Sequence, residues 1–276
     1  MSVALPDRPG RPRWRPAPLV AASMGLHGLA GIAALAAPES WAWALGAVAA
    51  NHGVLGMAGM WPRGSLLGPN MTRLPEASRR RGEIAITFDD GPDPEVTPRV
   101  LDVLEAHGCR ATFFCIARRV REHAALCREI ARRGHAVENH SMAHRGTFPL
   151  LTLGGFRREI AGAQRAISDV TGTAPRFFRP PAGLRNPLLD PVLHEADLTL
   201  VTWTRRGFDT RDREPRRVAA RLVRGLAAGD ILLLHDGHAA RTASGVPVVL
   251  EALPRVLDAA RAAGLDPVAL PRALEA

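Results

Sequence analysis

Two long runs of uncharged, mostly apolar residues lie near the start of the chain. They cover residues 18–37 and 41–61 and are separated by the polar break Pro38-Glu39-Ser40. At about 1.5 Å per residue, a helix of either length spans the roughly 30 Å hydrocarbon core of a bilayer. Tryptophans stand at both ends of the second run, as interfacial aromatic residues do. The pattern predicts a hairpin of two transmembrane helices over residues 18–61.

Two other interpretations of these residues stay open. Residues 1–37 could form a secretory signal with a small-residue cleavage site at Ala34-Leu35-Ala36. The runs could also be a pair of buried soluble helices, because Ala and Gly make both only mildly hydrophobic and Asn51-His52 interrupts the second. Glycines that recur in both runs would let the two helices approach closely within a membrane.

From Glu83 onward, short apolar runs alternate with amphipathic stretches, which is typical of β/α units around a parallel sheet. The apolar runs predict strands at residues 84–88, 111–116, 135–138, 176–178, 198–203, 231–234 and 266–269. The amphipathic stretches predict helices at about 96–107, 118–133, 153–170, 187–195, 215–227 and 247–263. Seven strands with six intervening helices predict the α/β class and a distorted (β/α)7 barrel.

The two apolar runs separate an N-terminal tail from a linker and a C-terminal domain. Residues 1–17 are rich in Pro and Arg and are expected to be a disordered basic tail, and residues 62–82 are expected to be an Arg- and Pro-rich linker. The remaining residues, 83–276, form the expected catalytic domain.

Arginine flanks the expected hairpin on both sides, whereas the link between its helices carries only Glu39. The positive-inside rule then places both ends of the hairpin, and with them the catalytic domain, on the cytoplasmic face of a bacterial inner membrane. A periplasmic or secreted catalytic domain is the alternative if the first run is a signal.

The net charge of +9 raises the question of a nucleic-acid partner, but the basic residues are scattered arginines with no stacking aromatics among them, and the chain has no Tyr. Nucleic-acid binding is therefore not expected. Attraction to anionic lipid or to a phosphate-bearing substrate stays open. Cys109, Cys115 and Cys127 are odd in number and form no CxxC pair, so free, buried thiols are expected.

Polar side chains follow five of the predicted strands. The carboxyl ends of the strands of a barrel meet at one rim, which is where such folds place their catalytic groups. The residues concerned are Asp89 and Asp90, His140 and His144, Arg179, Asp209, and His235. Five separate loops that each bring a charged or imidazole group to one rim indicate an active site there.

Asp90, His140 and His144 could together hold one metal ion. Each part is weak alone, since Asp-Asp-Gly is common in turns or helix caps and a His pair is often only surface. Together they offer three ligands of the types that zinc and similar divalent metals prefer, and they leave a position for water. Together they have the open geometry of a catalytic site with one metal ion.

The motifs resemble those of the polysaccharide deacetylase (NodB-homology) family of carbohydrate esterases over about residues 83–269. Thr87-Phe88-Asp89-Asp90-Gly91-Pro92 is the first family motif, and His140-Ser141-Met142-Ala143-His144 is the second. The resemblance implies that Asp89 is the general base, that Asp90, His140 and His144 hold one divalent metal, and that this metal is zinc, with cobalt, manganese or nickel as alternatives.

The third and fifth motifs also have counterparts. Arg179-Pro180-Pro181-Ala182-Gly183 matches the third, and the resemblance implies that Arg179 pairs with the catalytic Asp89. Ala182 stands where relatives often carry Tyr, although its backbone N–H could still stabilise an oxyanion. Leu233-Leu234-His235 matches the fifth, which places Leu233 beside the substrate and makes His235 the general acid; His238, nearby, is the competing residue.

The fourth motif departs from the family pattern. Asp209 and Asp212 are both present, but Arg213 stands where Trp is usual, and Trp203 lies upstream instead. Asp209 is expected to orient His235 as a carboxylate partner of the imidazole. A solvated acidic loop is the other interpretation of this segment.

The combined pattern predicts removal of an N-acyl group, most simply N-acetyl, from an amino sugar. A cytoplasmic catalytic domain would favour a lipid-linked or short substrate over a mature polysaccharide. A catalytically silent glycan-binding subunit and an amidase that acts on a non-sugar substrate are the alternatives. The membrane and the glycan are the only partners that the residues indicate.

Overall fold

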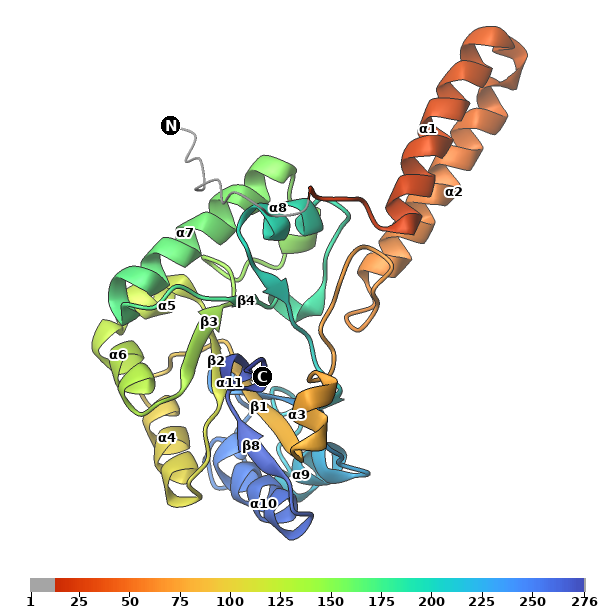
Figure 1. Cartoon of the computed structure of the whole chain (residues 1–276). Helices are drawn as coiled ribbons and strands as arrows, with labels where there is room; N and C mark the ends of the chain where they lie inside the picture. Colours follow the sequence, from red (N-terminus) through yellow and green to blue (C-terminus); the bar gives the residue numbers. More distant parts are fainter. Residues whose placement is uncertain (1–12, 276) are drawn as a thin grey trace.

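The structure is a computed structural model that describes residues 13–275, so most of the tail expected over residues 1–17 lies outside the described part. It consists of an α/β domain and a pair of long helices that stand away from that domain (Figure 1).

Eight strands form one sheet, and every pair of neighbours is parallel. The strands are β1 (Glu83–Asp89), β2 (Thr112–Cys115), β3 (Ala136–Asn139), β4 (Phe177–Phe178), β5 (Thr199–Leu200), β6 (Arg205–Arg206), β7 (Ile231–His235) and β8 (Asp266–Val268).

The helices that follow β1 along the chain connect the strands and cover the outside of the sheet, whereas the first two helices stand away from it (Figure 1). The α-helices are α1 (Pro18–Ala36), α2 (Trp41–Gly59), α3 (Glu76–Arg80), α4 (Thr97–Ala106), α5 (Ala117–Glu122), α6 (Ala124–Arg132), α7 (Leu153–Thr171), α8 (Leu189–Glu195), α9 (Pro215–Val223), α10 (Val248–Ala262) and α11 (Leu270–Ala273). The 3-10 turns are η1 (Pro38–Ser40), η2 (Phe148–Leu150) and η3 (Pro181–Gly183).

The predicted parallel α/β architecture is confirmed, but the barrel is open. The strand order is β5-β4-β3-β2-β1-β7-β6, with β8 paired to the first half of β1. No ladder joins β5 to β6 within the described residues. The strand expected at 198–203 is shortened to β5, and β6 was not expected because Arg205 and Arg206 interrupt the apolar pattern.

The segment expected as a linker, residues 62–82, is ordered against the domain. Met71 forms a parallel bridge with Val201, and Arg73 forms an antiparallel bridge with Asp230. The amide N–H of Leu74 donates to the carbonyl of Gly229 (2.9 Å). This segment therefore lies along the open side of the sheet, between β5 and the residues that precede β7.

Helix 118–133 was expected to be continuous but breaks at His123, whose φ of −124° and ψ of 46° are not helical. The break separates α5 from α6. Because of it, Val120 on the first helix and Cys127 and Ile130 on the second all reach the same core cluster. All three cysteines are free and buried, as expected.

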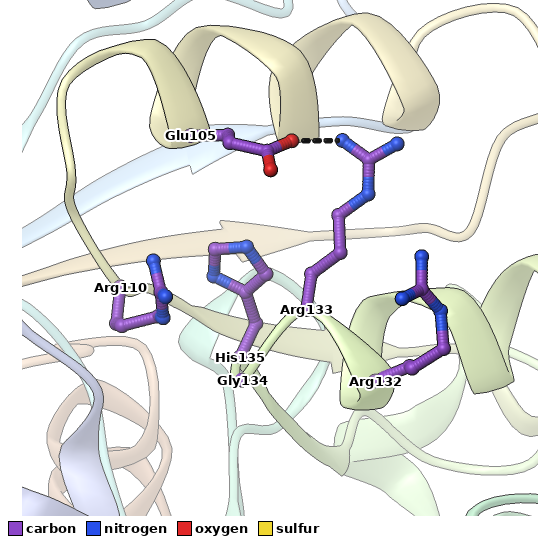
Figure 2. A pocket seen from close by; sticks show the side chains of 6 residues that line it. All are labelled: Glu105, Arg110, Arg132, Arg133, Gly134 and His135. Carbon is purple, nitrogen blue, oxygen red and sulfur yellow. Dashed lines mark hydrogen bonds and ion pairs between the residues drawn. The ribbon is translucent and has the colours of Figure 1, made fainter.

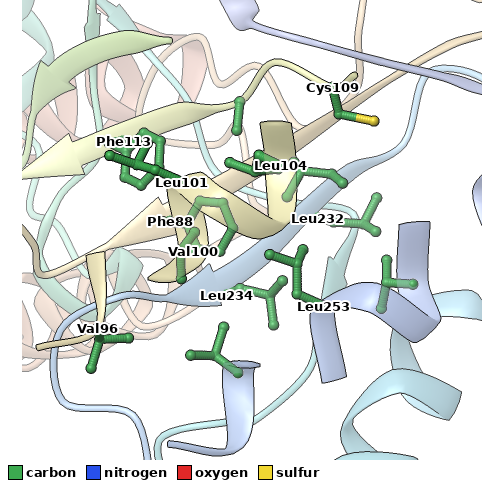
Figure 3. Packing of buried hydrophobic residues seen from close by; sticks show 14 of the residues in the cluster. Phe88, Val96, Val100, Leu101, Leu104, Cys109, Phe113, Leu232, Leu234 and Leu253 are labelled. Atoms are coloured by element: carbon green, nitrogen blue, oxygen red, sulfur yellow. The ribbon is translucent and has the colours of Figure 1, made fainter. Parts of the chain in front are cut away.

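Alternation along β1 determines which side chains enter the barrel. Ile84, Ile86 and Phe88 point outward into the large core cluster under the helices, where Figure 3 shows Phe88 among residues of α4, β2 and β7. Successive side chains in a strand point to opposite faces, so Thr87 and Asp89 point inward. The apolar burial of one face thus fixes Asp89 at the inner rim.

The two N-terminal helices pack on each other along their length and form a hairpin (Figure 1). By length and composition, one described helix, α1, qualifies as a membrane span, with a mean hydropathy of 1.7 over its most apolar window. The helix α2 does not meet the same measure. A small cluster of Val20, Leu55, Ala58 and Leu67 joins the base of the hairpin to the domain.

Candidate active site

Asp90, His140 and His144 lie together at the carboxyl ends of β1 and β3. Their ligand atoms lie within 4.8 Å of one another. The Nε2 atoms of His140 and His144 are 3.3 and 3.1 Å from Oδ1 of Asp90. That oxygen is buried, yet it accepts no hydrogen bond of normal geometry from the described residues. Three ligand atoms face a common point, as they would around a cation.

The electrostatics of this cluster favour a positive charge at its centre. Burial alone would raise the pKa of Asp90, but the imidazoles of His140, His238 and His144 hold it well below its usual range. Burial opposes protonation of His140, while the carboxylates of Asp89 and Asp90 raise its pKa. Burial and the neighbouring His140 lower the pKa of His144.

Hydrogen bonds fix both imidazoles in place. Nδ1 of His140 lies 2.7 Å from the carbonyl oxygen of Arg179, which makes Nδ1 the donor and leaves Nε2 to face Asp90. The His140–His144 loop is held by Glu159 of α7, whose carboxylate accepts from the amides of Met142 (3.1 Å) and Ala143 (3.2 Å). No sequence motif pointed to Glu159, which was expected only as part of an amphipathic helix.

Asp89 and Arg179 form a fully buried ion pair inside the barrel. Nη1 of Arg179 donates to Oδ1 of Asp89 (2.6 Å) and to Oγ1 of Thr87 (2.8 Å). Its remaining nitrogens donate to the carbonyls of Val201 (3.2 Å) and Thr202 (2.9 Å). Each of the three guanidinium nitrogens thus donates at least one hydrogen bond, and the bond to Asp89 uses Oδ1 and leaves Oδ2 free of Arg179.

Burial lowers the pKa of Arg179, and the adjacent carboxylate opposes this shift. The guanidinium also lies 4.1 Å from the ring centroid of Phe114, where the π face can stabilise the cation.

His235 and Asp209 form a second buried pair. Oδ1 of Asp209 lies 2.9 Å from Nδ1 of His235, and Oδ2 accepts from the His235 amide (2.7 Å). Burial would lower the pKa of His235, but Asp209 raises it to about 9. The imidazole is therefore protonated at neutral pH, and Nε2, which does not face Asp209, carries a proton.

The third-motif loop forms the η3 turn, with Ala182 at a φ of 55°. The amide of Gly183 donates to Pro180 (2.8 Å), whereas no backbone bond of the described residues uses the Ala182 N–H. Leu233 on β7 is 1% exposed. Its neighbours Leu232 and Leu234 enter the outer core, so Leu233 faces the interior together with His235.

Strained backbone gathers around these residues. Among residues 13–275, seven non-glycine residues have a positive φ; six of them lie in the loops at this rim, and the seventh is Asp197. Such conformations cost free energy and persist where the surrounding structure imposes them, often at functional sites. The six residues are Asp90, Ser141, His144, Ala182, Phe208 and His238.

The base of the helical hairpin braces the third-motif loop. The amide of Arg185 donates to the carbonyl of Gly59 (3.2 Å), and its Nη2 donates to the carbonyl of Gly64 (2.6 Å). A Cβ at Gly59 would collide with the carbonyl of Arg185, so only glycine fits there. The catalytic rim therefore lies directly against the end of the hairpin, which the sequence alone did not indicate.

The structure separates the two acids of the fourth motif. Asp209 is fully buried against His235, but Asp212 binds Arg217 (2.8 Å) and Arg221 (2.7 Å) outside the cluster. Arg213, in the place of the usual Trp, lines an open pocket with Phe208. Trp203 packs against the third-motif loop instead, near the position that a Cβ on Gly183 would take.

Two residues at the site were missed or only weighed as competitors. His238 places Nδ1 at 3.2 Å from Oδ2 of Asp90, and its Nε2 lies 3.0 Å from Nη2 of Arg119. Arg119 also donates to the carbonyl of Asp90 (2.9 Å). Since Arg119 can only donate, Nε2 of His238 accepts and Nδ1–H points to the carboxylate. His238 thus supports Asp90 from outside the cluster.

A separate hollow near Arg110 and His135 does not belong to the site (Figure 2). It lies where β2 and β3 begin, at the opposite end of the strands. Arg133 forms ion pairs there with Asp102 (2.8 Å) and Glu105 (3.1 Å). Burial lowers the pKa of His135 to about 4, and its Nδ1 accepts from a backbone amide, so this imidazole is neutral.

The domain is similar in sequence to proteins described as deacetylases. The family model described as polysaccharide deacetylase matches residues 76–201. A peptidoglycan-N-acetylglucosamine deacetylase of Listeria monocytogenes is 34% identical over 181 residues, which are 64% of this chain and 37% of that protein. A chitooligosaccharide deacetylase of Azorhizobium caulinodans is 35% identical over 176 residues, which are 60% of this chain and 81% of that protein.

Among solved structures, the chain is similar to a family 4 carbohydrate esterase from Streptomyces lividans in complex with acetate. The TM-score is 0.61 at 31% sequence identity, with 67% of this chain and 91% of the other covered. The chain spans only about a third of the length of the Listeria proteins that it matches, at 37%.

Proposed function

Because this chain belongs to the polysaccharide deacetylase family, we propose that it is a metal-dependent hydrolase that removes the N-acetyl group from N-acetylglucosamine units of a glycan. One observation carries the proposal. The buried pairs Asp89–Arg179 and Asp209–His235 lie on the same rim as the Asp90–His140–His144 cluster. A base, an acid and a metal site are thus available to one amide bond.

The residues present fit a divalent metal. The buried Oδ1 of Asp90 lacks a hydrogen bond although two imidazole nitrogens lie close to it. One carboxylate oxygen and two imidazoles are a donor set that zinc accepts. We propose zinc, held by Asp90, His140 and His144. A bound metal would polarise the acyl carbonyl and lower the pKa of a water molecule.

The side chains supply the proton transfers. Oδ2 of Asp89 is positioned to take the proton of the attacking water, while the hydrogen bond from Arg179 fixes the direction of the carboxylate. The free N–H of Ala182 stabilises the oxyanion that develops on the carbonyl. Nε2 of His235, protonated through its pairing with Asp209, gives a proton to the leaving nitrogen. Acetate and a free amino sugar result.

The test is acetate release from N-acetylglucosamine oligomers by the full chain, with zinc removed and then restored. We expect release only with metal, and a rate that falls as pH rises through about 9, where His235 loses its proton. The sign follows from the raised pKa, since the acid form is the active one below it. No release from any such oligomer despite bound metal would contradict the proposal.

We further propose that the hairpin anchors the domain in a membrane. Its polar side chains meet between the helices: Nδ2 of Asn51 donates to Oγ of Ser23 (2.7 Å), and the Nε2 atoms of His27 and His52 lie 3.3 Å apart. The outward faces are mostly apolar, although His27 and His52 are exposed there, and the exposed large apolar residues include Met24, Leu29, Ile32, Leu35, Trp43 and Met57. This arrangement suits lipid better than water.

The arginines on both flanks support a cytoplasmic catalytic domain, which would work on a lipid-linked or short glycan at the inner membrane. The check is a pair of C-terminal fusions, one to a fluorescent protein that matures in the cytoplasm and one to alkaline phosphatase. We expect the first to be fluorescent and the second inactive. The reverse result would place the domain in the periplasm, where polymeric peptidoglycan lies.

A further inference from the structure

An open pocket of about 600 Å³ lies between α9 and the loop that joins β6 to α9, and it has no part in the chemistry described so far. It is lined by Phe208, Arg211, Asp212, Arg213, Arg217 and Arg221. Phe208 directly precedes Asp209, whose carboxylate holds His235. One peptide bond thus joins a residue of the pocket lining to Asp209, the hydrogen-bond partner of the proposed general acid His235.

The lining is strongly basic, with four arginines and one acid. Asp212 is already neutralised, because Arg217 and Arg221 both bind it. Within the described part of the chain, no hydrogen bond or ion pair engages the guanidinium of Arg211 or Arg213. Two positive groups therefore remain available to a ligand.

An aromatic ring stands at this pocket in an unusual conformation. Phe208 has a φ of 61° and is 46% exposed, which is costly for a bulky side chain. The guanidinium carbons of Arg206 and Arg221 lie 5.1 and 5.8 Å from its centroid. Nε of Arg206 is buried without a hydrogen-bond acceptor. The chain thus holds an apolar face outward between cations.

We propose that this pocket is a subsite for an anionic group of the substrate, a phosphate or carboxylate carried next to the amino sugar that is deacylated. Guanidinium groups recognise both anions through paired, charge-assisted hydrogen bonds. Phe208 is 46% exposed, so the uncovered part of its ring can contact the sugar that carries this anion. This inference rests on the proposed function, and it narrows the substrate from amino-sugar glycans in general to those that carry negative charge.

The experiment uses the full, zinc-loaded chain in detergent and compares three proteins. These are the native chain, the double variant Arg211→Gln/Arg213→Gln, and the control Arg216→Gln, which removes an exposed arginine of α9 outside the pocket lining. The substrates are a neutral N-acetylglucosamine tetramer, the same tetramer with a 1-phosphate, and a peptidoglycan glycan fragment with lactyl carboxylates.

We expect the double variant to lower kcat/KM about tenfold for a charged substrate, mainly through KM, since two charge-assisted contacts are lost. The neutral tetramer and the Arg216→Gln control should stay at the native value. Loss on the phosphate alone or on the carboxylate alone identifies the anion. Equal loss on charged and neutral substrates, or no loss on either, overturns the proposal.

Binding separates this inference from the proposed function. Calorimetric titration with N-acetylglucosamine 1-phosphate should show weaker binding to the double variant than to the native chain and to the Arg216→Gln control. If acetate release fails but this difference in binding holds, the anionic subsite stands and the deacetylase proposal falls. If release succeeds and the three proteins bind the sugar phosphate equally, the subsite is wrong.

Discussion

The Asp89→Asn variant is expected to release acetate about 10²–10⁴-fold more slowly than the native chain while it binds zinc at the native level. The amide cannot take a proton from water, so the loss should appear in kcat. The metal should stay, because the three proposed ligands are other residues. Metal content by elemental analysis and acetate release on the same sample check both statements.

Because Asp89 pairs with the buried Arg179, the stability of the Asp89→Asn variant must also be measured. Arg179 is fully buried, and removal of one partner from a buried ion pair costs roughly 3–5 kcal/mol. Asparagine keeps an acceptor for Nη1, and Arg179 retains Thr87 and two carbonyls, so the fold should survive with a lower Tm.

The matched control for Asp89→Asn is Asp93→Asn, four residues further along the chain, in the loop that follows β1. Oδ1 of Asp93 accepts from the amides of Glu95 (2.9 Å) and Val96 (3.0 Å), a turn-capping role that Asn also fills. This variant should keep native activity. Native activity in Asp89→Asn would instead show that Asp89 is not the general base.

The Asp90→Ala variant is expected to lose both its bound metal and its activity. Asp90 supplies the carboxylate of the three-ligand cluster, and its removal leaves only the two imidazoles, which also lose the anion that stabilises a cation beside them. Zinc titration monitored by calorimetry should show no high-affinity site. Acetate release should fall to the level of the metal-free native chain.

A second variant, His238→Ala, tests whether zinc binding requires Asp90 itself or also the residues that contact it. His238→Ala removes a group that contacts Oδ2 of Asp90 but lies outside the cluster. Loss of such a supporting hydrogen bond weakens metal affinity about 10–100-fold, so His238→Ala should still bind zinc at higher concentration. High-affinity zinc binding by Asp90→Ala would contradict the assigned ligand set.

Local sequence features were sufficient where the chemistry is carried by short motifs at strand ends. The alternation of β1 fixes Thr87 and Asp89 inward, and the apolar run of β7 delivers His235 to the same rim. Features that depend on contacts between separate segments of the chain could not be predicted from local sequence patterns. Strand β6 is formed by two arginines, and its pairing with β7 depends on residues such as Asp230, which binds Arg205.

By itself, the sequence determined the parallel α/β class, the apolar hairpin and the set of acids, imidazoles and arginine at the rim, because each follows from local periodicity or a short motif. Only the tertiary structure decided that the barrel is open, that residues 62–82 lie along its open side, and that Gly59 and Gly64 brace the loop of Arg185. It also separated Asp209 from Asp212. The reason is physical. The contacts of residues 62–82, Gly59 and Gly64 join residues more than a hundred positions apart, and no local pattern encodes them. Local patterns also do not encode whether β5 and β6 pair or which of two similar acids becomes buried.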